Sequence, residues 1–523
     1  MASAHSPASR PRQRVNLVLA AAAVFLLFTS AAAQDAAQVL RLSVGYRTAK
    51  NSANLTAETQ AEVDQIAKLA QEASAAQKYG DALKHYYHAI AVIRGNAWTP
   101  AREWSNALAI KLDKAVLEPG DALRLTLNRI YIPDQKLEGK LTGSVGVSKT
   151  VADDPSPIKT VDPLSLDTGS TALSVDLTAP QLPDGVYRIA FLIKQGNPAA
   201  EPITFNTNIR VEKGLAARVA AAKSRADKLA ARLKETNKDK LLAALPSGEY
   251  RISMYDLANS FQIGADRINF TQELQETDAI LGALESGLDP FATRKGDFRK
   301  AYRSKVDNTL QPYRIFVPAA YDGSKAYPLI IALHGMGGDE NSYFDLYGSG
   351  AFKKEADRRG YIVACPKGRN PASLYIGTAE RDVIDVLDEV RHAYNIDPSR
   401  IYLTGHSMGG YGTWSVAMNH PDIFAALAPI SGGGSPPGMA KIARIPQLVV
   451  HGDNDKTVPV SASRVMVEAG RKLNTEIKYI EIPGGDHVSV ALRTFGEVFD
   501  WFDAHKRNGA EAAAGASGNS HKR

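Results

Sequence analysis

The C-terminal part of the chain alternates short apolar runs with helical stretches, and this alternation limits its fold more than any other feature. From about Tyr313 onward the apolar runs are YRIFV, PLIIAL, YIVAC, IYLT, FAALAPI, QLVV and IKYIEI. Between them lie stretches of helical character such as AERDVIDVLDEVRHAY and VSASRVMVEAGRKL. Apolar strands interleaved with helices predict a mostly parallel sheet with helices on both faces. Ligand sites in such sheets lie beyond the carboxyl ends of the strands.

The chain ahead of this unit changes character three times. Residues 57–94 predict a helical hairpin, because apolar residues recur there at three- and four-residue spacing. Residues 100–212 consist of short alternating runs separated by Pro, Gly and Asp turns, a pattern typical of a β-sandwich of immunoglobulin size. Residues 214–290 return to helix, and the apolar stripe from Leu215 to Leu233 indicates a helix packed on a neighbouring domain.

The first 33 residues carry the features of a secretory signal peptide. Three arginines between positions 10 and 14 precede the apolar core VNLVLAAAAVFLLF, and the small residues of SAAAQ offer cleavage after Ala33. The apolar core is short for a membrane span of about 20 residues, which favours cleavage over a retained anchor. We therefore expect a secreted or periplasmic protein with no integral membrane span after cleavage.

Charge and cysteine content exclude several classes of partner. The 523-residue chain has a formal net charge of +6, and the three arginines of the leader account for half of it, so we expect no nucleic-acid partner. Cys365 is the single cysteine and cannot form an intramolecular disulfide; in the run YIVAC we expect a buried, inert thiol. His85 and His88 lie three residues apart but have no third ligand nearby, so we expect no metal and no cofactor.

The sequence GHSMG has the surroundings that a nucleophile elbow requires. The strand-like run IYLT precedes it and the helical stretch GGYGTWSVAMNH follows it. Gly405 and Gly409 remove the Cβ atoms that would clash in a tight strand-to-helix turn, which would hold the Ser407 hydroxyl above the sheet. The helix N-terminus behind it favours a developing negative charge. We expect a structural role for His406, and the alternative for Ser407 is an ordinary serine in a small-residue turn.

A serine hydroxyl needs a base, and the base needs an orienting acid. In chain order the elbow serine is followed by Asp or Glu and then by His. QLVVHGDNDKTVP places Asp455 just after a strand, and IKYIEIPGGDHVSV places His487 just after the next one. We therefore predict Ser407, His487 and Asp455 as nucleophile, base and acid, with Asp453 as the alternative acid.

A tetrahedral intermediate also needs hydrogen-bond donors for its oxygen anion. The sequence PLIIALHGMGGDE places a loop directly after a strand, and this loop can aim the backbone N–H of Met336 at the point faced by the N–H of Met408. We predict these two groups as the oxyanion hole. His334 and His451 are expected to form hydrogen bonds within their own loops rather than to transfer protons.

Together, the motifs LHGMGGDE, GHSMGGYGTW, HGDNDKTVP and GGDH resemble those of secreted α/β-hydrolase esterases. These include feruloyl and acetylxylan esterases, polyhydroxybutyrate-depolymerase-like proteins and the related prolyl-oligopeptidase-like hydrolases. The resemblance covers about the last 200 residues, and the family pattern H-G-x-x-D-x-x-V-P is similar to the sequence from His451 to Pro459. The whole chain resembles bacterial esterases with an immunoglobulin-like domain ahead of the hydrolase. The resemblance implies a carboxylesterase that acts on small or polymer-linked esters.

We therefore expect six segments along the chain. They are a signal peptide at 1–33, a helical hairpin segment at 34–98, an immunoglobulin-like β-sandwich at 99–213, a helical linker at 214–300, an α/β-hydrolase domain at 301–507 and a disordered tail at 508–523. Two other functions stay open: a serine peptidase of the prolyl oligopeptidase type, and a non-catalytic binding protein with a hydrolase fold. No four-strand repeat of about 40–45 residues precedes the hydrolase, which favours the esterase over the peptidase. The upstream segments could contact a polymer or a protein partner.

Overall fold

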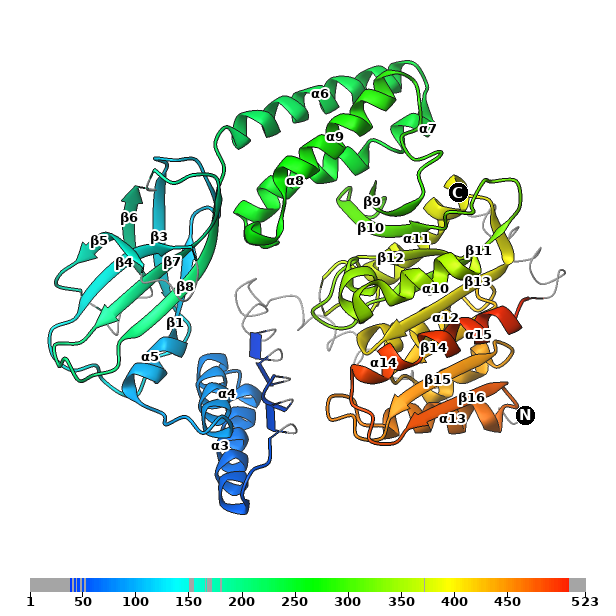
Figure 1. The fold of residues 1–523 in the computed structure, drawn as a ribbon. Helices are drawn as coiled ribbons and strands as arrows, with labels where there is room; N and C mark the ends of the chain where they lie inside the picture. The colour runs from blue at the N-terminus through cyan, green and yellow to red at the C-terminus, as the bar shows by residue number, and fades with distance from the viewer. Residues whose placement is uncertain are drawn as a thin grey trace, which may run out of the picture.

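The computed structural model describes most of the chain between residues 38 and 507 (Figure 1). Within that range it leaves out residues 40, 41, 44, 48, 51, 52, 150–154, 165, 167–171, 179, 180 and 371. The expected signal peptide and the expected C-terminal tail lie outside the described residues. No helix in the described part of the chain is long and apolar enough to cross a membrane.

The C-terminal half is built on one eight-stranded sheet in the order β16-β15-β14-β13-β11-β12-β10-β9. Six neighbouring strands, from β16 to β12 in this order, run parallel, whereas β10 and β9 are antiparallel additions at one edge. The prediction of a mostly parallel α/β sheet is confirmed. The strands are β9 (Gly296–Arg303), β10 (Leu310–Val317), β11 (Tyr327–Leu333), β12 (Ile362–Pro366), β13 (Ile396–His406), β14 (Ala426–Ile430), β15 (Gln447–Gly452) and β16 (Ile477–Ile482).

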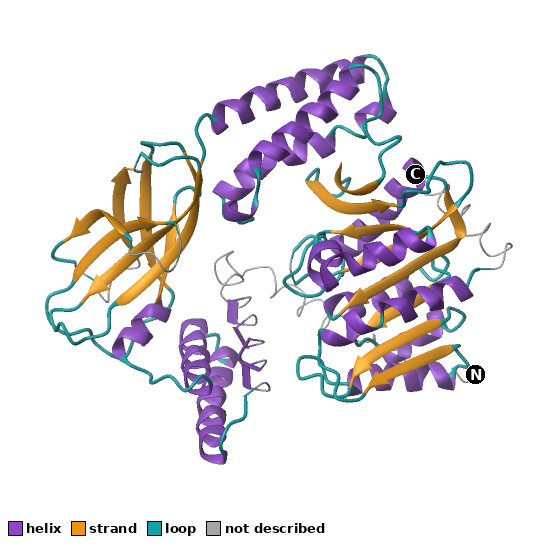
Figure 2. Cartoon of the chain, in the orientation of Figure 1, coloured by secondary structure: helices purple, strands orange, loops and turns teal. Residues whose placement is uncertain are grey.

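Helices cover both faces of this sheet, as Figure 2 shows. Side chains alternate between the two faces of a strand, and each face has its own apolar core. On β11, Ile331 belongs to the core that includes Trp414 of α12, whereas Ile330 belongs to the core that includes Phe352 of α10 and Phe499 of α15. The helices of this half are α10 (Ala351–Arg359), α11 (Thr378–Ala393), α12 (Met408–Asn419), α13 (Ser461–Lys472), α14 (Ser489–Arg493) and α15 (Phe495–Ala504).

Two smaller sheets lie upstream and share one apolar core. The first has the order β1-β3-β6 and the second the order β2-β8-β7-β4-β5. Leu125 of β3 and Phe191 of β7 are both fully buried in the core between them. We call residues 108–211 the two-sheet unit. Its strands are β1 (Leu108–Leu112), β2 (Val116–Leu117), β3 (Ala122–Arg129), β4 (Thr142–Ser148), β5 (Ser156–Val161), β6 (Ala172–Thr178), β7 (Gly185–Lys194) and β8 (Ile203–Val211).

Ahead of the two-sheet unit lie helices α3 (Ala57–Ala75), α4 (Tyr79–Ile93) and α5 (Pro100–Ala107). Helices α3 and α4 pack against each other around buried apolar residues such as Val63 and Leu83. The carboxylate of Glu103 on α5 is buried and accepts hydrogen bonds from the backbone N–H groups of Asp134 and Gln135, both at 2.9 Å. These two bonds join α5 to the loop that follows β3.

Helices α6 (Leu215–Glu235), α7 (Asp239–Leu242), α8 (Pro246–Asn259) and α9 (Phe270–Glu285) connect the two-sheet unit to the large sheet (Figure 1). Tyr250 of α8 and Ile280 of α9 belong to the same apolar core as Phe298 of β9. The Asn259 side-chain oxygen at the other end of α8 accepts hydrogen bonds from two backbone N–H groups at the start of β2, at 3.1 and 2.9 Å. Because α8, α9 and β9 contribute to one apolar core, the helices and the large sheet are packed together. The expected boundary at residue 301 lies inside β9.

Lys300 on β9 is buried in that core, with 6% of its surface exposed. Its ammonium lies 4.9 Å from the ring centroid of Phe291, 5.8 Å from that of Tyr394 and 6.0 Å from that of Tyr313. Burial lowers the pKa of Lys300, although the nearby carboxyl group of Glu389 acts in the opposite direction. The folded protein therefore disfavours the charged form of this side chain.

We predict that Lys300→Met raises the midpoint of thermal unfolding at pH 7 by a few degrees, corresponding to about 1 kcal/mol, because a buried charge is replaced by an apolar side chain of similar length. Because the pKa of Lys300 is lowered in the folded state, this side chain destabilises the fold fully at a pH below that lowered pKa. The destabilisation disappears as pH rises to the ordinary pKa of lysine, where the side chain is neutral in the folded and the unfolded chain. The difference between variant and native protein should therefore shrink between pH 7 and pH 10. Differential scanning calorimetry across this range measures it; a constant difference would contradict the prediction.

Candidate active site

Ser407 lies on a sharp turn between β13 and α12. Its backbone has φ 57° and ψ −116°, a conformation that residues other than glycine rarely adopt. A Cβ on Gly405 would overlap the carbonyl group of Gly409, and a Cβ on Gly409 would overlap the carbonyl oxygen of Leu333 at the end of β11. The turn can therefore form only with glycine at both positions, and it holds Ser407 at the carboxyl end of β13.

The structure brings Ser407, His487 and Asp455 together in one chain of hydrogen bonds. His487 Nε2 lies 2.8 Å from Ser407 Oγ, and His487 Nδ1 lies 2.6 Å from Asp455 Oδ2. Asp455 follows β15 and His487 follows β16, so the three side chains come from the carboxyl ends of three parallel strands. With Nδ1–H donating to the carboxylate, Nε2 is left as the acceptor for the serine hydroxyl, which is the tautomer that a general base requires.

The Asp455 carboxylate is buried and fully engaged. Its Oδ1 accepts hydrogen bonds from the N–H groups of Thr457 and Val458, at 2.9 and 2.8 Å, and its Oδ2 also lies 3.3 Å from His451 Nε2. Burial alone would raise the pKa of Asp455, but the contacts with His451 and His487 outweigh it and hold the pKa well below its usual range. The carboxylate therefore stays ionised at neutral pH and can orient the His487 ring.

The alternative acid, Asp453, has a different position. Its Oδ1 accepts a hydrogen bond from the backbone N–H of Gly484 at 2.6 Å, which joins the loops that follow β15 and β16. Asp486, beside His487, accepts from the N–H groups of Val488 and Ser489 at the start of α14, at 3.0 and 2.9 Å. Both carboxylates shape the loops around His487, whereas the His487 ring itself forms hydrogen bonds with Asp455 and Ser407.

The loop after β11, residues 334–341, lies directly against Ser407; we call it the β11 loop. A Cβ on Gly335 would stand 3.4 Å from the Ser407 Cβ, so Met336 is one residue away from a direct contact with the serine. Met408 is the first residue of α12, and its N–H has no acceptor within the helix. The geometry therefore places the two expected oxyanion donors on the two segments that meet at Ser407.

His406 joins the elbow to the loop that carries the base. Its ring is 3% exposed, and Nε2 lies 2.6 Å from the carbonyl oxygen of His487. Burial and the neighbouring His487 together lower the pKa of His406 to about 4, so the ring is neutral at neutral pH. Because Nε2–H must donate to the carbonyl oxygen, Nδ1 is an acceptor, and the Tyr347 hydroxyl at 3.1 Å can donate to it.

Tyr347 extends this connection to the β11 loop. Its hydroxyl oxygen accepts a hydrogen bond from the Gly335 N–H at 3.3 Å while its proton points to His406. One directed path thus runs from Gly335 through Tyr347 and His406 to the backbone of His487. Tyr347 could not be identified from the sequence, because it lies in no motif and its partner His406 is 59 positions further along the chain.

The other expected histidines and the loop after β12 also have defined positions. One ring nitrogen of each histidine lies near a carbonyl oxygen of its own loop, as expected: His334 Nδ1 is 2.8 Å from that of Gly335, and His451 Nε2 is 2.9 Å from that of Val458. The other ring nitrogens contact other segments, His334 Nε2 the Lys367 carbonyl oxygen at 2.8 Å and His451 Nδ1 Ser463 Oγ at 2.7 Å. His451 also contacts the Asp455 carboxylate, a contact that no sequence motif indicated. Several exposed apolar side chains lie on the loops and short helices that follow β11, β12 and β16. They are Met336, Leu346, Leu374, Ile376, Val488 and Leu492.

Comparisons with known proteins find a family model, related sequences and solved structures that are similar to this chain. The model of the prolyl oligopeptidase family matches residues 376–433, which include the elbow. A protein described as a probable feruloyl esterase C of Aspergillus oryzae is 30% identical over 190 residues, covering 34% of this chain and 68% of that protein. The bifunctional acetylxylan esterase/xylanase of Neocallimastix patriciarum is 35% identical over 132 residues, covering 24% of this chain and 19% of that protein. Among solved structures, a thermostable esterase aligns with a TM-score of 0.39 and 18% identity, covering 77% of this chain and 100% of the other.

The chain spans only 19% and 56% of the length of the first two curated relatives that it matches. The feruloyl esterase C relative of Aspergillus oryzae, by contrast, is covered over 68% of its length. The elbow, the hydrogen-bond chain and the sheet order are what a hydrolase of this type requires. The chain therefore belongs to the family of α/β-hydrolase esterases that includes the feruloyl esterases.

Proposed function

We propose that this protein is a serine carboxylesterase that hydrolyses acyl esters through an acyl-enzyme intermediate on Ser407. The observation that carries the proposal is the unbroken hydrogen-bond chain from the Ser407 hydroxyl through His487 to the buried Asp455 carboxylate. A serine hydroxyl becomes nucleophilic when an adjacent base takes its proton, and the base is held in the right tautomer by a third group. Membership in a family of esterases supports an ester as the bond that is cleaved.

In the proposed reaction, Ser407 Oγ attacks the ester carbonyl carbon while His487 Nε2 takes its proton. The backbone N–H groups of Met336 and Met408 stabilise the oxygen anion of the tetrahedral intermediate. The protonated His487 then gives its proton to the leaving alcohol as the carbon–oxygen bond breaks. A water molecule that transfers a proton to His487 attacks the acyl group and releases the acid, and Ser407 regains its proton. Asp455 stays ionised throughout and stabilises the His487 cation.

The side chains around the site support an ester with an apolar acyl group. Leu346 is 71% exposed and Ile376 is 63% exposed, on loops at the same edge of the sheet as Ser407. Exposed apolar side chains gathered at one edge commonly mark a binding surface. Relatives described as a probable feruloyl esterase and a bifunctional acetylxylan esterase/xylanase support small or polymer-linked esters as substrates.

A serine peptidase is the second candidate, because the prolyl oligopeptidase family model matches residues 376–433. A prolyl oligopeptidase usually has a β-propeller of repeated four-stranded blades ahead of its hydrolase. In the described part of this chain, the strands ahead of β9 form one sheet of three and one of five, which supports the esterase. A non-catalytic role for the hydrolase fold is the third candidate.

We further propose that the chain is exported, on the signal-like character of residues 1–33. We also propose that the expected six segments are its functional divisions, with an immunoglobulin-like unit at 99–213 and the hydrolase at 301–507. On this proposal the segments ahead of the hydrolase hold it near a polymer or a protein partner.

The first test compares the hydrolysis of p-nitrophenyl acetate by the protein and by its Ser407→Ala variant. We expect turnover that is lost in the variant, by a factor of at least about 10³, because the acyl-enzyme cannot form. Equal turnover in both proteins would mean that the elbow is not the reactive centre. Turnover of a peptide panel but not of esters would favour the peptidase, and no Ser407-dependent turnover of either would favour a non-catalytic role.

We predict that Asp455→Asn lowers kcat by about 10⁴, because the amide can donate to His487 Nδ1 and so stabilise the wrong tautomer of the ring. The matched control is Asp453→Asn, two residues away in the same loop, which should retain kcat within about threefold. Steady-state kinetics with p-nitrophenyl acetate and circular dichroism of both variants provide the measurement. Near-normal turnover in the Asp455 variant would refute the assignment of the acid.

We predict that Tyr347→Phe lowers kcat by about tenfold with little change in KM, because it removes the hydroxyl that joins Gly335 to His406. Tyr343→Phe is a suitable control: its ring lies 5.0 Å from that of Tyr347, and its hydroxyl has no hydrogen-bond partner among the described residues. Equal kinetics of the two variants would show that the Tyr347 hydroxyl does not support the site.

A further inference from the structure

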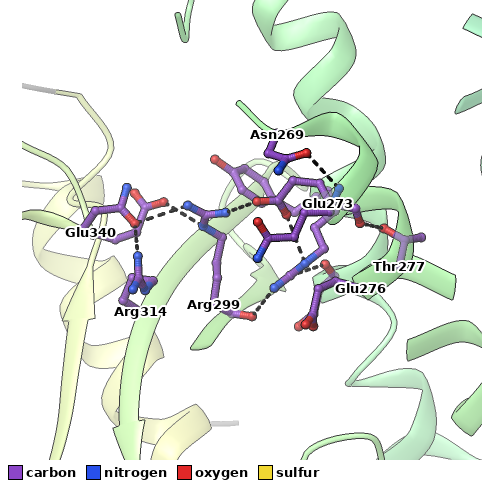
Figure 3. Close-up of polar contacts among 12 residues, drawn as sticks. Asn269, Glu273, Glu276, Thr277, Arg299, Arg314 and Glu340 are labelled. Atoms are coloured by element: carbon purple, nitrogen blue, oxygen red, sulfur yellow. Dashed lines mark hydrogen bonds and ion pairs between the residues drawn. The ribbon is translucent and has the colours of Figure 1, made fainter. Parts of the chain in front are cut away.

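Charged and polar side chains form a continuous connection between α9 and the β11 loop, and Arg299 of β9 lies at its centre (Figure 3). The Arg299 guanidinium has three partners: Nη1 donates to Glu273 Oε1 at 3.0 Å, Nε to Glu340 Oε1 at 3.3 Å and Nη2 to Asn341 Oδ1 at 3.2 Å. Glu273 belongs to α9, whereas Glu340 and Asn341 end the β11 loop. A single side chain thus joins the helical region to the loop that carries Met336.

The β11 loop is compact, so a contact at its end also fixes its middle. The Gly338 N–H donates to the Gly335 carbonyl oxygen at 3.1 Å, which closes a tight turn around Met336. Glu340 follows two residues after this turn and is only 3% exposed. A carboxylate so deeply buried is stable only with a partner, and Arg299 provides the guanidinium.

On the helical side, Glu273 lies between two arginines. Its Oε1 accepts from Arg299, and its Oε2 lies 3.2 Å from Arg251 Nε of α8 as an ion pair without hydrogen-bond geometry. Arg251 is 5% exposed, and its Nη2 donates to the Arg299 backbone oxygen at 3.0 Å. Burial lowers the pKa of Arg251 to about 10, so it remains a cation at neutral pH. Helices α8 and α9 therefore both support the Arg299 side chain.

A second arginine holds the same end of the loop from β10. Arg314 Nη1 donates to Asn341 Oδ1 at 2.7 Å, and its Nε donates to Asp297 Oδ1 at 2.8 Å. Asn341 is therefore shared by Arg299 and Arg314. Because a guanidinium is planar and its donors are fixed in direction, two such contacts on one amide oxygen restrict the loop more than a lysine could.

We propose that Arg299 is a positioning residue that holds the β11 loop so that the Met336 N–H faces the oxygen anion at Ser407, and that α8 and α9 are therefore part of the catalytic unit. The inference rests on the proposed esterase function, in which Met336 is an oxyanion donor. Its physical basis is that a preorganised donor contributes to catalysis only while its backbone is held in place. The Arg299 side chain itself does not touch the reacting atoms.

The experiment compares Arg299→Lys with Arg294→Lys in the full chain. Lysine keeps the charge but cannot bind three partners in one plane, so Arg299→Lys is expected to loosen the loop without leaving Glu273 and Glu340 uncompensated. Arg294 is the matched control, because it forms two hydrogen bonds with Glu276 of α9, the helix that also carries Glu273, at 2.8 and 3.2 Å. The pair of Arg294 and Glu276 does not include the β11 loop.

We predict about tenfold lower kcat with p-nitrophenyl acetate for Arg299→Lys, KM within twofold, and about tenfold weaker inhibition by an aryl trifluoromethyl ketone. This ketone adds to serine and forms an oxygen anion at the same place as the reaction intermediate, so its Ki reports the oxyanion donors. Arg294→Lys should change none of these values by more than twofold. A merely structural role of Arg299 would lower the amount of folded protein but leave Ki unchanged.

Hydrogen exchange monitored by mass spectrometry gives a readout that does not need turnover. Peptides of the β11 loop should exchange faster in Arg299→Lys than in the native protein and in Arg294→Lys. If Arg299→Lys does not fold, Glu340→Gln tests the same contact from the loop side, with the same expected pattern. Unchanged exchange and unchanged Ki, or equal changes in both lysine variants, would overturn the proposal. If the native protein shows no Ser407-dependent turnover of esters, the esterase function is refuted. The hydrogen-exchange comparison would still decide whether Arg299 holds the β11 loop.

Discussion

The close approach of three backbone segments at the elbow is the constraint on which the rest of the site depends. The end of β11, the end of β13 and the start of α12 meet where Gly405 and Gly409 leave no room for a side chain. This contact forces Ser407 into its unusual backbone conformation and points it at the edge where β15 and β16 end. Asp455 and His487 can then contact it from loops of ordinary length, because parallel neighbouring strands end at the same edge.

Around the serine, the polar side chains are held from two directions. The buried path through Tyr347 and His406 joins the β11 loop to the backbone of His487, within the large sheet and its loops. The contacts of Arg299 reach the other end of the same loop from β9, with helix α9 behind them. Both sets use buried or half-buried groups joined by directed hydrogen bonds, and such networks favour one geometry over its alternatives.

Much of this arrangement could be predicted because its signals are local in the sequence. Strand and helix alternation predicted the α/β sheet, and the glycines of the elbow predicted where the turn lies. The structure brings Ser407, Asp455 and His487 together, as the order of their motifs suggested. Tyr347 and Arg299 could not be found in this way, because each acts through partners far away in the chain and neither belongs to a repeating pattern. The start of β9 at Gly296 was likewise placed in the expected helical linker at 214–300, because its strand character depends on pairing with β10.

Helix α8 has a further mechanical consequence. Near one end, Asn259 is bonded to the backbone at the start of β2, and nearer the other, Arg251 supports the ion pair that holds the β11 loop. Arg251 and Asn259 are eight positions apart, which corresponds to about 12 Å of α-helix, a length over which a helix behaves as a stiff rod. Helix α8 therefore contacts the two-sheet unit at one end and the side chains that hold the β11 loop at the other, so that one stiff element sets the spacing between these two parts of the chain.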